Sequence, residues 1–385
     1  MPVVPAYIVA ARRSALGRIG GLHRNRRIDA LTAPVIEAAL ADAGVAPDQI
    51  DEFILGNATE GSNPARLVAL AAGLPECVSA ISVDRQCASG LDAILAAIRA
   101  IATGGADIVV AGGAESLSTA PWRVARPRNP YQVPHFVHIE PTSSDGTGEA
   151  QPFPASEALA RRLGITRAAQ DAWTFAAHQR AEAAREARGF VGEIVALRAN
   201  AEEARDQSAT APDVEELAET VPFVAGDGTL TPANTSALHD GAAFAIVASE
   251  AAWKGLGSPP ALRLLASTAL GVSPAEEAVA PIAATRKLLA RRTGLSMAEI
   301  GAIEMSESSA AQALAFAEAF HIDAARINPH GGAVVRGHPL GASGAVLVTR
   351  LFTGMARGGG SGAPLGLATL GALGGIGVAA LFERV

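Results

Sequence analysis

The sequence has little of what several classes of protein depend on. Only two cysteines occur in 385 residues, too few for a disulfide framework or a structural zinc site, so we expect no bound metal. The net charge is -7 and no run of Lys and Arg forms a basic stripe, so we expect no nucleic acid as a partner. No uninterrupted apolar run is long enough to span a bilayer, so we expect no membrane partner either.

The chain is instead rich in apolar residues and glycine. Hydrophobic residues make up 49%, charged residues 18%, and there are 40 glycines, which favours a large α/β core with many tight turns. A length of 385 residues predicts two or three domains or lobes. The opening stretch MPVVPAYIVAARR does not match a secretory signal, because its apolar part is short and precedes the arginines. We expect a cytoplasmic protein with reduced thiols.

Strand-like and helical segments alternate in the first third and again in the last third of the chain. This alternation predicts βαβ units and a parallel sheet buried on both faces. Near residue 119 the sequence becomes rich in proline and arginine, and helical and charged stretches follow. We therefore divide the chain into an N-terminal half (1–118), an inserted lobe (119–248) and a C-terminal half (249–385). As an alternative, the first strand and helix of the last segment pack against the N-terminal half.

One cysteine stands in a setting that favours reactivity. The turn DRQCASG places Cys87 between a predicted strand and the first turn of a predicted helix. Backbone N–H groups and the helix dipole there favour a thiolate, and such an elbow presents its central side chain to an open site. A small buried cysteine without a function fits the same pattern equally well. Cys77 has no such turn, and we expect it to be structural.

A nucleophilic thiolate needs a base or cation close by, usually a histidine. Among eight histidines, His338 stands out in RGHPLGASG, with glycine before it and proline after it, just ahead of an apolar helix. Neighbouring glycines let a ligand or another backbone approach. A tight connection or a phosphate cradle would also explain this turn, although the Gly-Lys-Ser/Thr ending of a Walker A loop is absent. We take Cys87 and His338 together as a candidate catalytic pair.

Taken together, these two segments resemble the thiolase family, and the resemblance extends over nearly the whole chain. The segments that match in order and spacing are AARRSALGRIGG, ILGN, NPARLVALAAGLP, DRQCASGL, DIVVAGGAESLS, GITRAAQDAW, TPANTSALHDGAA, GGAVVRGHPLGASG and the glycine-rich pair of C-terminal strands. The resemblance implies an α/β, thiolase-like five-layer αβαβα fold of two similar halves, with 119–248 as an inserted loop lobe that binds CoA. It implies no cofactor: acyl-CoA and CoA are substrates and partners of a homodimer or homotetramer.

The resemblance also assigns a reaction. Cys87 would accept the acyl group as a thioester, and His338 would activate the thiol and help to bind the thioester oxygen. The backbone N–H of Cys87 would form part of an oxyanion hole. The implied function is that of a thiolase-like acyl-CoA acyltransferase, of the acetyl-CoA C-acyltransferase type found in fatty acid metabolism. It passes the acyl group to CoA or to a CoA-bound acceptor.

Three positions depart from the family pattern. Ser306 stands where the family has a water-binding Asn, Gly371 stands where it has the second cysteine, and Leu373 stands where that motif has Gly. The second cysteine moves the α-proton of acetyl-CoA, a kind of step worth ~10² to 10⁴ in rate, and glycine cannot replace it. Glu307 and His330 are candidate compensating residues, although a helix-cap residue for Glu307 and a turn residue for His330 are the simpler interpretations.

Three functions therefore stay open. The first is the thiolase-like acyltransferase. The second is a related enzyme with a changed second step, which uses a different acceptor or a decarboxylating condensation. The third is a degenerate, non-catalytic family member that binds acyl-CoA; the retained Cys87 and His338 count against it, because a binding module needs neither.

Overall fold

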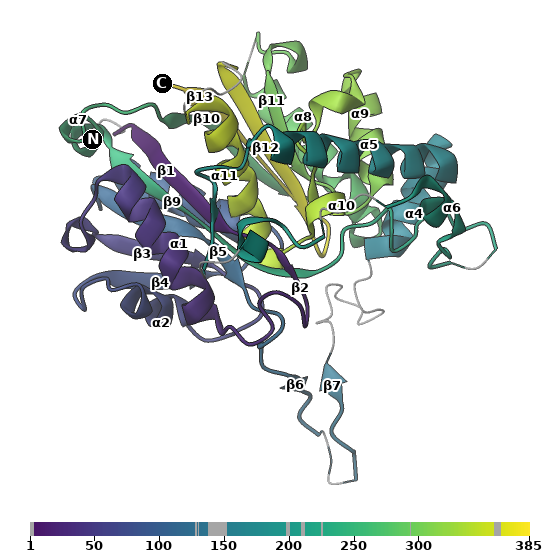
Figure 1. The fold of residues 1–385 in the computed structure, drawn as a ribbon, viewed down its shortest axis with the longest axis horizontal. Coiled ribbons are helices and arrows are strands. Elements are labelled where there is room, and N and C mark those ends of the chain that lie inside the picture. The colour runs from purple at the N-terminus through teal and green to yellow at the C-terminus, as the bar shows by residue number, and fades with distance from the viewer. Residues whose placement is uncertain are drawn as a thin grey trace.

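The computed structural model describes residues 4–127, 129, 131–137, 152–197, 201–208, 212–224, 226–292, 294–357 and 363–385. Its principal strands are ordered β11-β12-β13-β10-β1-β9-β5-β3-β4, and β1 and β10 join the sheets of the two halves (Figure 1). The elements of the N-terminal half are β1 (Ala6–Ser14), β2 (Gly17–Arg18), α1 (Ile28–Ala43), β3 (Glu52–Gly56), α2 (Pro64–Ala71), β4 (Ser79–Val83), α3 (Ser89–Ala102), β5 (Ile108–Glu115) and β9 (His239–Ser249).

The C-terminal half repeats this arrangement. Its elements are β10 (Leu262–Gly271), the 3-10 helix η3 (Pro274–Val279), α8 (Ala280–Ala290), β11 (Ala302–Ser306), α9 (Ala310–Phe320), α10 (Ala333–Arg336), α11 (Ser343–Met355), β12 (Leu365–Ala372) and β13 (Ile376–Arg384). In sheet order, β3, β5, β9 and β1 correspond to β11, β12, β13 and β10. The counterpart of β4 is the segment at Ile327, which forms a single bridge with Ile303 of β11. Two similar halves are present, although the sequence shows no close internal repeat.

Three apolar clusters separate five layers. The central cluster joins α3 and α11 to the inner faces of both sheets, and these two helices pack against each other. The second cluster joins α1 and α2 to the outer face of the N-terminal sheet, and the third joins α8 and α9 to the outer face of the C-terminal sheet. The five-layer αβαβα fold expected from the sequence is confirmed. The periodic face of α3 (Leu91, Ile94, Leu95, Ile98, Ile101) is buried in the central cluster.

The sheet is parallel, as expected from the sequence, only in part. β3, β4 and β5 run parallel to one another, as do β11 and β12, but β1, β9, β10 and β13 pair antiparallel. The physical reason lies in the connections. β12 and β13 form a hairpin, and β9 returns from the inserted lobe to lie between β1 and β5. A hairpin joins antiparallel strands without a crossover helix, whereas a parallel pair needs a crossover connection.

The segment 119–248 contains β6 (Arg123–Val124), β7 (Phe136–Val137), α4 (Pro152–Leu163), α5 (Arg167–Glu186), β8 (Ile194–Val195) and α6 (Val214–Glu219). β6 and β7 form a two-stranded ribbon that projects from the body of the molecule (Figure 1). Both α4 and α5 pack against α9 of the C-terminal half. The last ten residues of this segment form most of β9, which belongs to the sheet of the N-terminal half. α7 (Glu250–Gly255) packs on β1 and β9, whereas β10 pairs mainly with β13.

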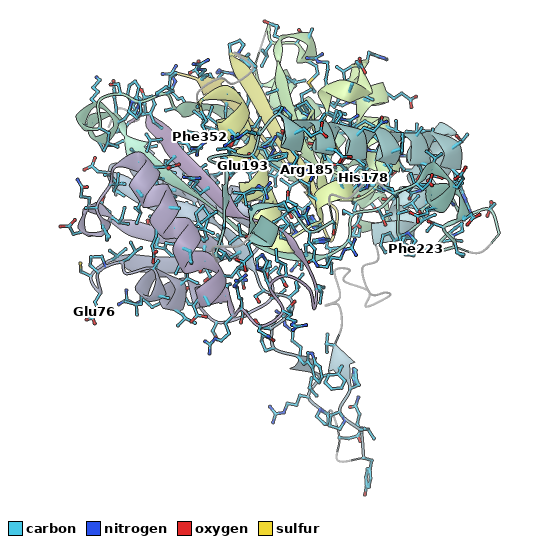
Figure 2. All side chains as sticks on the ribbon, viewed as in Figure 1. Glu76, His178, Arg185, Glu193, Phe223 and Phe352 are labelled. Carbon is cyan, nitrogen blue, oxygen red and sulfur yellow. The ribbon has the colours of Figure 1, made fainter. Side chains whose placement is uncertain are left out.

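A buried ion-pair network ties the lobe to both halves. Glu193, labelled in Figure 2, accepts hydrogen bonds from Arg13 of β1 (Nε to Oε1, 2.6 Å) and from Arg350 of α11. Asp206 binds the other side of the Arg13 guanidinium at 2.6 and 3.0 Å. Removing one partner of such a pair strands a buried charge, so the network holds the lobe in one position. None of the described helices has the length and apolar character needed to cross a membrane.

Candidate active site

Cys87 lies in the elbow between β4 and α3. Gln86, the residue before it, has a φ of 51°, and Ala88, the residue after it, is the N-cap of α3. The hydroxyl of Ser89 closes the turn: it accepts from the backbone N–H of Arg85 at 2.8 Å and donates to the carbonyl of Gln86 at 2.6 Å. The predicted strand–turn–helix elbow is therefore present, and its left-handed residue turns the chain so that the thiol faces the cavity described below.

His338 occupies the corresponding place in the C-terminal half, in the loop that leads into α11. Its backbone N–H donates to the carbonyl of Ala237 (2.8 Å), and its carbonyl accepts from His239 N–H (3.1 Å). The preceding Gly337 has a φ of 99°, and a Cβ there would lie 2.1 Å from the His239 ring. Only glycine fits that position, which explains the Gly-His-Pro sequence.

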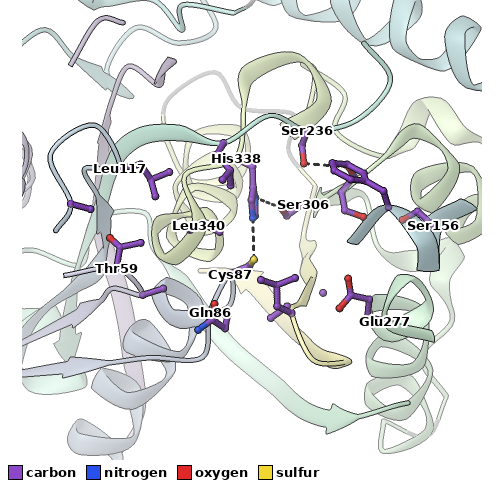
Figure 3. Close-up of a pocket in the computed structure, with 18 of the residues that line it drawn as sticks. Thr59, Gln86, Cys87, Leu117, Ser156, Ser236, Glu277, Ser306, His338 and Leu340 are labelled. Carbon is purple, nitrogen blue, oxygen red and sulfur yellow. Dashed lines mark hydrogen bonds between the residues drawn. The ribbon is translucent and has the colours of Figure 1, made fainter. Parts of the chain in front are cut away.

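The two functional side chains meet directly. The Nε2 atom of His338 lies 3.1 Å from the Sγ atom of Cys87, and its Nδ1 atom lies 3.3 Å from the hydroxyl of Ser306 (Figure 3). The same Nδ1 atom lies 2.9 Å from the hydroxyl of Ser343. This approach depends on close contact between the starts of the two central helices. A Cβ at Gly90 of α3 would lie 2.6 Å from the carbonyl oxygen of Gly341, so glycine is needed there as well.

Burial decides the protonation state of the pair. Burial raises the pKa of the Cys87 thiol to about 12, although the backbone N–H groups of Leu373 and Cys87 act in the opposite direction. Burial likewise lowers the pKa of His338 to about 4. The thiolate expected from the helix N-terminus is therefore not the resting form. The pair rests as a neutral thiol beside a neutral imidazole, and His338 can accept the thiol proton when Cys87 reacts.

Cys87 and His338 open onto a cavity of about 750 Å³. Its wall combines the N-terminal half, the inserted lobe and the C-terminal half. It is lined by Ala58, Thr59, Gln86, Cys87, Leu117, Ala120, Pro121, Trp122, Arg123, Phe136, Val137, Phe153, Ser156, Ser236, Leu238, Glu277, Ala278, Ser306, Ser308, Gln312, His338, Leu340, Gly371, Ala372 and Leu373. A cavity of this size accommodates an extended organic ligand next to the thiol.

Two family models match nearly the whole chain. The thiolase N-terminal domain matches residues 6–251, and the thiolase C-terminal domain matches residues 259–384. The chain belongs to the thiolase family. Curated relatives include the acetyl-CoA acetyltransferases of Allochromatium vinosum and Pseudomonas aeruginosa, each 38% identical over 98% of both chains. The crystal structure of the Bacillus anthracis acetyl-CoA acetyltransferase is 32% identical, covers 100% of both chains and superimposes with a TM-score of 0.92.

All three positions that depart from the thiolase pattern face the same cavity. Ser306, at the end of β11, lies beside the His338 ring, and Gly371 and Leu373 come from β12 and the turn that follows it. The backbone N–H of Leu373 points at the Cys87 sulfur and favours its charged form. A Cβ built at Gly371 would meet no atom closer than 3.4 Å, so the cavity has room for a side chain there.

The structure brings neither candidate compensating residue to the cavity wall. Glu307 accepts from the side chain of Asn328 and from the backbone N–H of Ala333 (2.8 Å), and burial raises its pKa to about 7. His330 binds Arg350 through Nδ1 at 2.7 Å, and burial lowers its pKa to about 4. Both side chains hold the loop ahead of α10 in place, because their polar atoms are directed at that loop and at Arg350.

One ionisable group at the cavity carries no signal in the sequence. Glu277 of η3 lines the cavity (Figure 3). Its charge raises the pKa of Cys87. No local pattern marks it, because PAEEAV resembles an ordinary helix start. Cys77, which we expect to be structural, is exposed. Within the described residues no group of three or more His, Cys, Asp or Glu is arranged to hold a metal ion.

Proposed function

We propose that this chain is a thiolase-type acyltransferase that takes an acyl group from acyl-CoA onto Cys87 and passes it to CoA or to a CoA-bound acceptor. The observation that carries the proposal is the 3.1 Å contact between His338 Nε2 and Cys87 Sγ at the wall of a large cavity. The acyltransferase class expected from the sequence is confirmed by full-length relatives named acetyl-CoA acetyltransferase. A purely binding protein would need neither the histidine nor the thiol.

The geometry supports a defined acylation step. His338 Nε2 accepts the Cys87 proton as the sulfur attacks the thioester carbon, and the imidazolium then protonates the departing CoA thiolate. Because the thiol has a pKa of about 12, this transfer is needed at neutral pH. The backbone N–H groups of Cys87 and Leu373 face the reacting sulfur. From there they also stabilise the negative charge that develops on the thioester oxygen.

The inserted lobe supplies the part of the cavity that suits the rest of the CoA molecule. Trp122, Arg123 and Phe136 line the wall from the β6–β7 ribbon, and Phe153 and Ser156 line it from α4. An arginine suits a phosphate, and aromatic faces suit an adenine or an apolar acyl chain. We propose that segment 119–248 holds CoA and that no further cofactor and no metal takes part.

The second step uses an acceptor whose reacting end carries no carboxylate, rather than a malonyl-type one. Glu277 is a carboxylate on the cavity wall, and a second carboxylate beside it would be repelled. This counts against the decarboxylating condensation. Ser306 does not supply the histidine or asparagine that a decarboxylating site uses at that position.

The assembly we propose is a homodimer or homotetramer in the cytoplasm. β4 is the last strand of its sheet, and on it Ile81 is 48% exposed. A second copy of the chain that pairs with this edge would cover Ile81 and satisfy the free backbone groups. The β6–β7 ribbon exposes Trp122 and Tyr131 (83% and 96%), which suits contacts between dimers. Light scattering after gel filtration, with Ile81→Lys as the variant, tests the dimer.

One experiment tests the acyl transfer itself. The purified protein is mixed with acetyl-CoA and with longer acyl-CoAs, and its intact mass is recorded before and after free CoA is added. We expect one acyl increment that free CoA removes and that Cys87→Ala never acquires. Absence of the increment with every acyl-CoA would overturn the proposal.

A further inference from the structure

An empty space lies where the thiolase pattern has a proton-transferring thiol. Gly371 contributes no side chain, and a Cβ there would have Pro281, the backbone of Glu277 and Gln312 as its nearest neighbours, at 3.4, 3.6 and 3.7 Å. The side chain of Glu277 lines the same cavity. The residue next to the missing thiol is therefore itself an ionisable acid.

Several contacts hold Glu277 in this position. The backbone N–H of Gly374 in the β12–β13 turn donates to its Oε2 atom at 3.2 Å. The next residue, Ala278, is fixed by Gln312 of α9, whose Nε2 atom donates to the Ala278 carbonyl at 3.0 Å. In Figure 3 the carboxyl end of Glu277 points toward the side of the cavity that holds Cys87. Among the described residues it is the one carboxylate that lines this cavity.

We propose that Glu277 is the group that moves the α-proton in the second step, in place of the absent thiol at position 371; this inference rests on the proposed acyl transfer. The carboxylate removes a proton from the α-carbon of a CoA-bound acetyl group. The electron pair of that C–H bond forms the new C–C bond to the acyl carbon on Cys87. The bond from that carbon to sulfur breaks, and the departing Cys87 thiolate receives the proton from Glu277.

The environment of Glu277 suits this chemistry. Burial raises its pKa, although the backbone N–H groups of Gly374 and Gly375 oppose the shift. A raised carboxyl pKa brings the acid and base forms closer in energy near neutral pH, as proton transfer in both directions requires. Glu115 does not serve as an alternative, because its two oxygens are already bound to Asn57, Ala58, Thr59 and Gly341.

The test compares two neighbouring glutamates. Glu277→Gln keeps the shape and an acceptor for Gly374 but cannot take a proton. Glu276→Gln makes the same change of charge on a side chain that is paired with Arg162 at 3.0 Å and is absent from the cavity wall. Two rates are measured for each protein: acetylation of Cys87 by mass spectrometry, and incorporation of deuterium from heavy water into the acetyl group of acetyl-CoA. Circular dichroism and thermal unfolding verify that each variant is folded.

We expect Glu277→Gln to lower deuterium incorporation at least ~100-fold, as loss of a general base does, while acetylation changes by less than about threefold. Glu276→Gln leaves both rates unchanged. Adding Gly371→Cys to Glu277→Gln restores incorporation at least tenfold, because a thiol there enters the same space. If the double variant is acetylated but incorporates deuterium as slowly as Glu277→Gln, a thiol at position 371 and the Glu277 carboxylate do not act in the same space.

The remaining outcomes separate the inference from the acyl transfer on which it rests. Unchanged incorporation in Glu277→Gln overturns the inference, and so does an equal loss of acetylation and incorporation, which would show that Glu277 only positions the β12–β13 turn. Acetylation of the unaltered protein without any deuterium incorporation overturns the inference and leaves the acyl transfer standing. Failure of the unaltered protein to acetylate at all overturns both.

Discussion

The two halves of the chain repeat one arrangement of strands and helices but furnish the site with different groups. In each half a central helix begins at the site: α3 follows Cys87, and α11 follows His338. The halves differ at the ends of the neighbouring strands. β5 ends in the buried Glu115, which accepts hydrogen bonds from two backbone N–H groups. β12 instead reaches the cavity at Gly371, which has no side chain.

This difference teaches which parts of the site can change independently. The N-terminal half closes around the nucleophile with fixed hydrogen bonds and close helix contacts, so the position of Cys87 depends on packing. The C-terminal half leaves open space at Gly371 and places an ionisable acid, Glu277, beside it. From that half, acylation needs only the side chain of His338 and the backbone N–H of Leu373. The residues that serve the second step can therefore vary while the acylation geometry is kept.

The largest effect is expected where the halves meet, at His338. His338→Ala removes the base from a thiol whose pKa is about 12, so acylation at neutral pH should fall by ~10² to 10⁴. The acylation rate of the variant should then rise with pH, because only the thiolate fraction reacts, whereas the unaltered protein should depend far less on pH. Rates of mass increment from pH 6 to pH 9 measure this. A pH-independent variant would mean that Cys87 is already ionised.

The next prediction compares the loss of stability when one glycine in each half is replaced by alanine. Gly90→Ala would force a Cβ to 2.6 Å from the Gly341 carbonyl oxygen, and such overpacking should cost about 1 to 3 kcal/mol of unfolding free energy. It should also slow acylation, because it separates α3 from the loop that carries His338. Gly371→Ala meets nothing closer than 3.4 Å and should change stability by less than about 1 kcal/mol. Urea unfolding measures the free energy of unfolding of both variants. Equal losses of this free energy would contradict the comparison.

The last prediction concerns a pH dependence of stability from Glu115. Burial raises its pKa to about 8, so the folded chain keeps a proton that the unfolded chain releases above its ordinary pKa of 4.5. The free energy of unfolding should therefore fall as pH rises from about 5 to 8, since the folded state binds more protons in that range. Glu115→Gln should flatten this slope. Urea unfolding at several pH values measures it, and identical slopes in both proteins would show that Glu115 is ionised when folded.

Much of the fold was predictable because its signals are local. Apolar residues at helical spacing and the stop at Gly44 mark α1, and the strand predicted ahead of the Cys87 turn is β4. The pattern around Cys87 and His338 was equally local, because tight turns ahead of helices have recognisable sequences. The antiparallel place of β9 between β1 and β5 was not predictable, because it depends on how a chain returns from the inserted lobe.

The sequence by itself determined the family, the two-half organisation and the identity of the reacting pair, since each depends on short motifs in a fixed order. Only the tertiary structure decided that the pair rests neutral, that Glu307 and His330 are not part of the cavity wall, and that Glu277 is. The physical reason is that the burial of a side chain and its distance from other groups depend on segments that lie far apart in the chain. Glu277 reaches the site because η3 packs against β12 and α9. The sequence around position 277 contains no pattern that predicts this contact.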